Sequence, residues 1–218
     1  MSSRRTTLFI TIALTLLTAC GGARARPAPL TGVEGSRARA LADSLRYPYT
    51  EADIAFMSGM IHHHAQAIVI AQWAPSHGAS AELQRLTARI INAQQDEINL
   101  MQSWLRDRNQ PIPEPNPAGM TMRHGDAAHT MLMPGMLTAE QMAELDASRG
   151  AEFDKIFLAL MIQHHRGAVT MVRELFTSHG AGQDESIFKF ASDVEVDQTT
   201  EIRRMMQMLL QRGGIPPQ

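Results

Sequence analysis

The sequence predicts an all-α protein whose core is a bundle of four helices. Long segments carry apolar residues at helical spacing, and no segment has the alternating pattern of a strand. One pair of helical segments also occurs twice, with the same motifs in the same order. Two helical hairpins with apolar stripes bury each other most simply as a four-helix bundle.

Residues 1–19 are predicted to be an export signal. They have a basic start, MSSRR, an apolar run over residues 8–17 and small residues before Cys20. The run is too short to cross a bilayer comfortably and has the form of a secretory signal peptide. The ending LTAC resembles a bacterial lipobox, so we expect Cys20 to be lipidated and to anchor the mature chain to a membrane of the cell envelope. An ordinary signal peptide is the alternative.

Residues 20–42 are rich in Gly, Pro, Ala and Arg and are expected to form a flexible tether between the anchor and the bundle. Cys20 is the only cysteine, so the folded part has no disulfide and no thiolate ligand or nucleophile. The formal net charge is −2, and no basic stripe indicates a nucleic-acid partner.

The first helical hairpin is expected within repeat one, residues 43–108. Thr50 and Asp53 form a capping pattern at the start of its first long helix, and Pro75 ends that helix. A short helix is expected before the hairpin. The predicted helices cover about 36–46, 50–74 and 80–108.

The second hairpin is expected within repeat two, residues 138–212, after a connector at 109–137 and before a tail at 213–218. Thr138 and Gln141 form a capping pattern for a short helix that precedes it. The predicted helices cover about 138–149, 154–178 and 184–211.

The repeated motif places histidines beside the apolar stripe of the first helix in each hairpin. The pattern D-x-x-F-x-x-x-M-I-x-H-H-x-x-A begins at residue 53 and again at residue 154. At 100° per residue, His63 and His64 flank the inward stripe that contains Met60. His62 lies on the opposite side and is predicted to be solvated, since the second copy has Gln163 there.

The second helix of each hairpin carries a glutamate, Glu97 or Glu201, at a stripe position that should be core. A buried carboxylate there needs a hydrogen bond, a counter-charge or a metal ion. The two copies therefore direct imidazole, thioether and carboxylate groups into one interior, which favours a metal site. A set of satisfied His–Glu hydrogen bonds is the alternative. The candidate ligands are Met60, His63, His64, Glu97, Met161, His164, His165 and Glu201.

Imidazole and thioether ligands together favour copper, although another transition metal remains open. The chain has 15 methionines but only 7 phenylalanines, 2 tyrosines and 2 tryptophans. The connector is unusually rich in methionine and histidine, and proline and glycine on both sides argue against regular structure there. It is either a supply of soft-metal ligands or an apolar flap. Its candidates are Met120, Met122, His124, His129, Met131, Met133 and Met136. No Glu-x-x-His motif of a di-iron bundle occurs.

The doubled F-x-x-x-M-I-x-H-H-x-x-A, the doubled Q-x-x-E-I-x-x-M and the segment MPGMLTAEQMAEL resemble the bacterial family called domain of unknown function 305, over residues 43–212. The resemblance implies a ferritin-like four-helix bundle, export, and in periplasmic relatives copper binding through Met and His linked to copper tolerance. We therefore expect a copper-binding protein of the cell envelope or periplasm that sequesters the ion or passes it to other envelope proteins. A metal-dependent redox enzyme and a structural envelope protein with a polar His–Glu core are the alternatives.

Overall fold

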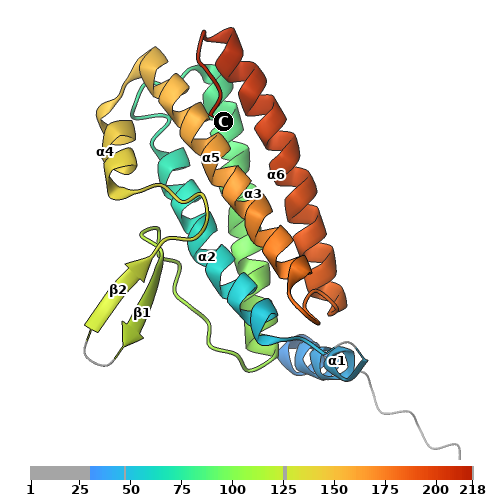
Figure 1. Cartoon of the computed structure of the whole chain (residues 1–218). Helices are drawn as coiled ribbons and strands as arrows, with labels where there is room; N and C mark the ends of the chain where they lie inside the picture. Colours follow the sequence, from blue (N-terminus) through green and yellow to red (C-terminus); the bar gives the residue numbers. More distant parts are fainter. Residues whose placement is uncertain (1–29, 47, 125–126, 218) are drawn as a thin grey trace, which may run out of the picture.

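The computed structural model describes residues 30–46, 48–124 and 127–217, and Figure 1 shows that helices make up most of them. The predicted signal peptide, the lipidation site Cys20 and the first part of the predicted tether lie outside the described residues. The same holds for the side chains of Met122 and His124 in the connector.

The predicted four-helix bundle is confirmed. Adjacent helices in the sequence pair as hairpins, and α2 packs against α5 to join the two hairpins (Figure 1). The bounds of the four bundle helices agree with the expected ones within two residues, except that α5 begins four residues before the predicted 154. The four helices are α2 (Glu51–Gln72), α3 (Ala81–Asp107), α5 (Gly150–Thr177) and α6 (Glu185–Gln211).

The bundle helices begin where side chains satisfy their free backbone N–H groups. The predicted capping box of α2 is present: the Thr50 hydroxyl accepts from Asp53 N, and Asp53 accepts from Thr50 N at 2.7 Å. Asp184 caps α6 by accepting from the backbone N–H of residues 186 and 187. It also accepts from Arg108 at 2.5 Å, so a buried ion pair ties α6 to the end of α3.

Two reciprocal hydrogen bonds fix how the hairpins lie against each other. Asp53 of the first hairpin accepts from Gly182 N, in the loop of the second hairpin, at 2.8 Å. Asp154 of the second hairpin accepts from Ser80 N, in the loop of the first, at 3.1 Å. Both carboxylates are buried, so each bond replaces water that these groups lose on folding. The two bonds bring the middles of antiparallel α2 and α5 to the same level.

The core consists of two apolar clusters, one toward each end of the bundle. One contains Phe56, Met60 and Leu175, and the other contains Ile70, Phe157 and Met161. Helix α2 is long and apolar enough to span a membrane by length and composition alone, but most of it is buried in this core. The middles of α2 and α5, between the clusters, hold the paired histidines.

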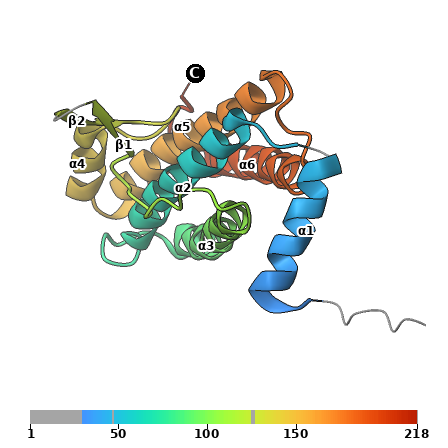
Figure 2. The ribbon, with the colours of Figure 1, turned by 90° about the horizontal axis from the view of Figure 1, so that it is seen from below.

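Two short helices precede the hairpins as expected. Helix α4 spans Ala139–Ala147 and has the predicted capping box of Thr138 and Gln141. Helix α1 spans Gly32–Arg46 and projects sideways from one end of the bundle (Figure 2). It begins four residues before the expected 36, so the predicted tether at 20–42 is helical from Gly32 onward.

The prediction of an irregular connector was wrong. Strands β1 (Met120–His124) and β2 (Ala127–Met131) form an antiparallel hairpin that extends to the side of α2 and α4 (Figure 1). Facing Cα partners include Met120 with Met131 and Thr121 with Thr130. Each strand has only five residues and lies between the prolines and glycines of the connector, so those residues delimit the hairpin and do not break it.

Candidate metal centre

The doubled histidines of α2 and α5 form one buried layer halfway along the bundle. We call His63, His64, His164 and His165 the imidazole layer; all four are fully buried. The ring centroids of His63 and His164, from opposite hairpins, lie 3.8 Å apart. The two rings within each pair lie 6.2 Å apart at the same 55° angle. The two hairpins thus contribute equivalent halves, as the repeated motif predicts.

Each glutamate expected in the core is bound to a histidine of its own hairpin. Glu97 Oε2 lies 2.7 Å from His64 Nε2, and Glu201 Oε2 lies 2.7 Å from His165 Nε2. A carboxylate accepts, so in the neutral imidazole Nε2 carries the proton and Nδ1 keeps its lone pair. This is the arrangement in which a carboxylate orients a metal-ligating histidine.

A tight turn of the connector covers His63. The Pro134 carbonyl lies 3.1 Å from His63 Nε2 and accepts its N–H, which again leaves the lone pair on Nδ1. The turn fits because two glycines meet: a Cβ on Gly167 of α5 would lie 1.9 Å from the Pro134 oxygen, and Gly135 adopts φ 75°. Glycine at both positions therefore allows the backbone contact that positions Pro134.

Five ring nitrogens of the imidazole layer have no hydrogen-bond partner among the residues that the structure describes. They are Nδ1 of each of the four histidines and Nε2 of His164. Buried polar atoms are nearly always paired, so a group of unpartnered lone pairs at the centre of a core indicates a ligand. Burial, reinforced by the neighbouring imidazoles, holds the pKa of His63 and of His164 well below its ordinary value. Both rings therefore stay neutral, the form that binds metals.

The prediction that His62 is solvated was wrong. Its side chain is buried, and its Nδ1 accepts from the backbone N–H of Asn116 at 3.1 Å. The helical wheel placed His62 correctly on the side away from the bundle interior, but the connector lies over that side. Burial also lowers the pKa of His62. The bond to the connector gives His62 a structural role outside the imidazole layer.

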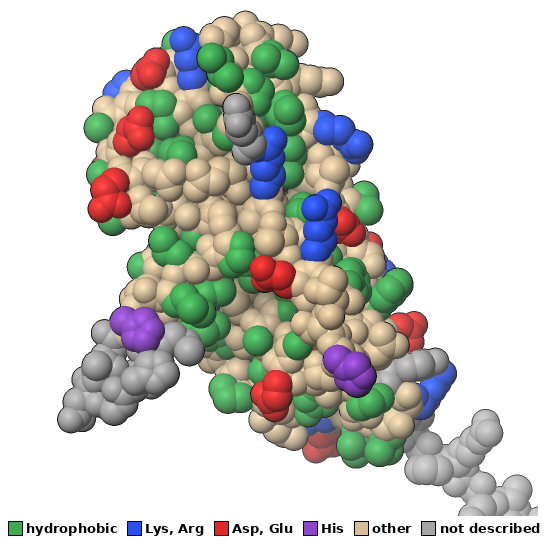
Figure 3. Space-filling view, viewed as in Figure 1, with side chains coloured by type: hydrophobic (Ala, Val, Ile, Leu, Met, Phe, Trp, Pro, Cys, Tyr) green, Lys and Arg blue, Asp and Glu red, His purple; other side chains and the backbone are tan. Residues whose placement is uncertain are grey.

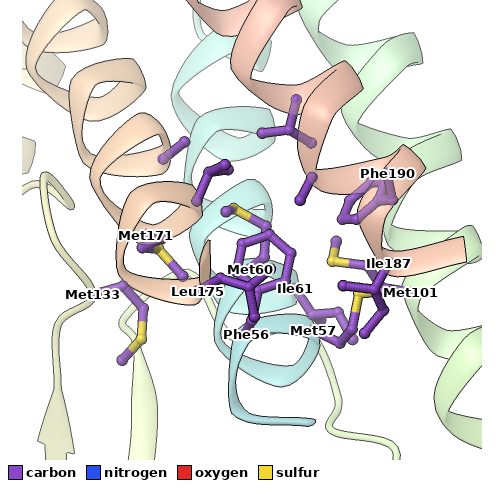
Figure 4. Packing of buried hydrophobic residues seen from close by; sticks show 14 of the residues in the cluster. Phe56, Met57, Met60, Ile61, Met101, Met133, Met171, Leu175, Ile187 and Phe190 are labelled. Carbon is purple, nitrogen blue, oxygen red and sulfur yellow. The ribbon is translucent and has the colours of Figure 1, made fainter. Parts of the chain in front are cut away.

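The predicted thioether ligands Met60 and Met161 lie on opposite sides of the imidazole layer. Met60 belongs to the apolar cluster that also holds Phe56 and Leu175, as Figure 4 shows, and Met161 belongs to the other cluster. Both are fully buried and precede the histidines by one helical turn. They adjoin the layer from its two ends but do not meet each other.

The connector methionines divide between core and surface. Met133 and Met136 are buried, Met120 is half-buried, Met131 is largely exposed, and His129 is exposed. Met133 lies next to Met171 of α5 (Figure 4), and together with Met131 they line an apolar cavity of about 340 Å³. Among the described residues on the face shown in Figure 3, the visible histidine side chains lie in the lower half, and the imidazole layer is enclosed.

The glutamates of the site border a cleft between α3 and α6 of about 300 Å³. Their side chains are 19% and 25% exposed, so they link the buried imidazoles to solvent. Asp197 and the buried Gln94 and Gln198 also line this cleft. In the described part of the chain, no three His, Cys, Asp or Glu side chains converge closely enough to form a ready-made metal cage.

Some residues of the site could not be predicted from the sequence. Pro134 acts through its carbonyl, which no side-chain pattern reveals, although the glycine that follows it marks a tight turn. Met171 and Asp197 carry no repeated motif: the position in the first copy equivalent to Asp197 is Ala93. Their roles follow from the packing of distant segments.

Comparison with known proteins identifies the family and the fold. The family model described as domain of unknown function (DUF305) matches residues 53–209. A DUF305 structure from Streptomyces coelicolor, named as a secreted protein, is 27% identical to this chain. The match covers 77% of this chain and 97% of the Streptomyces chain, with a TM-score of 0.62. A DUF305 fragment from Deinococcus radiodurans is 26% identical, covering 75% and 98% with a TM-score of 0.61.

CopM has been solved in Cu(II)-bound and Cu(I)-bound forms. These are 27% and 26% identical to this chain and cover 73% of it and 96% of CopM, with TM-scores of 0.56 and 0.55. The uncharacterized protein L153 of Acanthamoeba polyphaga mimivirus is 38% identical over 56 residues. These residues make up 26% of this chain and 37% of L153. The match of the family model to most of the helical bundle establishes that this chain belongs to the DUF305 family.

Proposed function

We propose that this chain is an exported copper-binding protein whose imidazole layer holds the ion. The observation that carries the proposal is the set of four buried, unpartnered Nδ1 atoms contributed equally by the two hairpins. Neutral imidazole is a good ligand for copper, and Glu97 and Glu201 orient two of the rings from behind. The copper-bound forms of CopM, which shares the fold, support the choice of metal.

Binding requires a small rearrangement of the rings. The ring centroids of His63 and His164 lie 3.8 Å apart with the ring planes tilted by 38°, which leaves no room for an ion between them. Copper–imidazole bonds are about 2 Å long, comparable to those of zinc, so the two rings must rotate apart to direct their lone pairs at one ion. Met60 and Met161, from the adjoining clusters, would then supply thioether sulfur, which favours Cu(I).

The His–Glu bonds alone would also suit a purely structural polar layer. The unpartnered nitrogens favour metal binding, because a structural layer has no reason to leave five buried ring nitrogens unsatisfied. Under the structural alternative, copper would not change thermal stability, and His-to-Gln substitutions in the layer would be mild.

The expected setting of this function is the cell envelope. The signal-like residues 1–19 and the lipobox ending at Cys20 favour an exported chain held at a membrane by a lipid anchor. The relative named as a secreted protein supports export. An anchored copper-binding domain suits sequestration of copper, or its transfer to other copper-handling proteins of the envelope.

Titration of the tag-free domain with copper tests the proposal. We expect stoichiometric binding that is lost in the double variant His63→Ala and His164→Ala. The matched control replaces an exposed histidine outside the layer, His179→Ala, and should leave binding unchanged. Weak, non-stoichiometric uptake that is the same in all three proteins would refute the assignment.

A further inference from the structure

We propose that the cleft between α3 and α6 is an outer binding site for a hydrated divalent cation, through which cargo reaches the imidazole layer. This inference rests on the proposed copper-binding function and adds a second site to it. The cleft has a volume of about 300 Å³ and lies on the outer side of Glu97 and Glu201. Each of these carboxylates already contacts the layer through one oxygen.

The first line of evidence is a pair of buried amides that line the cleft. Gln94 is 2% exposed and Gln198 is 3% exposed. Within the described part of the chain, both amide atoms of Gln94 and the Oε1 atom of Gln198 lack a hydrogen-bond partner. Such groups are costly to bury unless a ligand or ordered water satisfies them. The water shell of a cation can donate to both amide oxygens.

The second line of evidence is the charge around the cleft. Glu97, Asp197 and Glu201 line it together, while Arg89 and Arg204 also border it. Among the described residues, neither arginine forms an ion pair with these carboxylates. Burial, and to a lesser extent the negative charges of Glu97, Asp193 and Glu201, raise the pKa of Asp197, as expected where carboxylates lie close together. A cation between them would relieve their mutual repulsion.

A hydrated ion fits the geometry better than a bare one. The carboxylates do not converge into a direct-coordination cage in the described residues. Hard divalent ions that lose water reluctantly are often held through their water shell. Six such waters occupy roughly 180 Å³, at about 30 Å³ each, which the open cleft can accommodate.

The rest of the layer's surroundings favour this cleft as the entrance. The apolar clusters close the bundle on both sides along its axis. The Pro134 turn covers His63 on the connector side. Glu97 and Glu201 are partly exposed and contact His64 and His165 directly. Only these carboxylates would therefore separate an ion in the cleft from the imidazoles.

Stopped-flow uptake of aqueous Cu²⁺ tests the entrance. The variant Asp197→Asn removes one charge without touching the layer and should slow association about threefold to tenfold at low salt, with an unchanged dissociation rate. The difference should vanish near 1 M salt, where charges are screened beyond about 3 Å. The matched control, Glu144→Gln, removes an exposed carboxylate on α4 and should have no effect. Equal association rates for both variants and the wild type would overturn the proposal. It would also be overturned if Met131→Leu, which alters the apolar cavity beside the connector, slowed association and Asp197→Asn did not.

A second measurement separates this inference from the copper assignment. Mn²⁺ prefers oxygen ligands and retains water, so electron paramagnetic resonance should detect weak Mn²⁺ binding to the wild-type chain that Asp197→Asn abolishes. If copper fails to bind the imidazole layer but this Mn²⁺ binding is present, the proposed function is wrong and the outer site stands. Mn²⁺ binding that is absent, or indifferent to Asp197→Asn, overturns the outer site whatever copper does.

Discussion

Replacing Gly167 by alanine should release the connector turn from the site. A Cβ at this position would lie 1.9 Å from the Pro134 oxygen, 2.5 Å from its carbonyl carbon and 2.6 Å from Gly135 Cα. Real Cβ atoms essentially never approach closer than 3.0 Å, so the turn must move by at least about 1 Å in a closely packed region. The obstructing atoms are backbone, so no side-chain rotation can relieve the clash. The hydrogen bond from His63 to Pro134, now 3.1 Å long, would then exceed the usual limit.

The expected loss of unfolding free energy is about 1–5 kcal/mol. Overpacking costs about 1–3 kcal/mol, and leaving the buried His63 N–H without its acceptor costs a further 1–3 kcal/mol or so. Alanine in a helix recovers about 1 kcal/mol relative to glycine. Urea unfolding of the metal-free protein, followed by circular dichroism, measures the sum.

Gly59→Ala is the matched control, because it also places a Cβ in the middle of a helix beside the connector. Its nearest neighbours are Met133 Sδ at 3.0 Å and Met171 Cε at 3.4 Å, which belong to flexible side chains. We expect stability within about 1 kcal/mol of the wild type. If Gly167→Ala proves as stable as Gly59→Ala, the turn does not hold His63 as described.

Three further predictions concern the polar groups of the core. The metal-free protein should lose stability as the pH falls below 6.5, the ordinary pKa of histidine. Burial lowers the pKa of His63 and His164 in the folded state, so only the unfolded chain takes up their protons, and the slope approaches about 1.4 kcal/mol per pH unit for each histidine. Urea unfolding of the double variant His63→Gln and His164→Gln should show a flatter dependence on pH. His164→Leu should stabilise the metal-free protein by roughly 1 kcal/mol, because both ring nitrogens are unpartnered, while copper should no longer raise the melting temperature; a destabilised variant would show that the ring has a partner. Arg108→Met should cost about 3–5 kcal/mol in thermal or urea unfolding, because it leaves the buried Asp184 carboxylate without its positively charged partner. Lys189→Met breaks an exposed ion pair with Asp193 and should cost under about 1 kcal/mol. Equal effects of the two substitutions would contradict the assigned burial.

Local sequence signals predicted the helices well because the relevant physics is local. The cap formed by Thr50 and Asp53 involves residues three apart, so its pattern is readable from the sequence. Helical periodicity likewise placed His63 and His64 inward, and the repeated motif placed His164 and His165 beside them. The stripe position of Glu97 predicted that it needs a partner, and His64 is that partner.

The remaining features depend on segments far apart in the chain. A helical wheel describes one helix, so it could not show that Asn116 of the connector covers His62. The β-hairpin depends on pairing between two five-residue strands too short to give a clear alternating pattern. The contact between Pro134 and His63 joins residues 71 positions apart through a backbone carbonyl. Asp197 gains its importance only from lying across the cleft from Glu97.

The most direct test of the metal site is a crystal structure of the copper-loaded protein with an anomalous difference map recorded at the copper absorption edge. We predict a peak between α2 and α5, at the level of His63 and His164, with the two rings rotated out of their present contact at 3.8 Å to face the ion. A copper-saturated crystal whose peaks all lie elsewhere, with these rings still in contact, would contradict it.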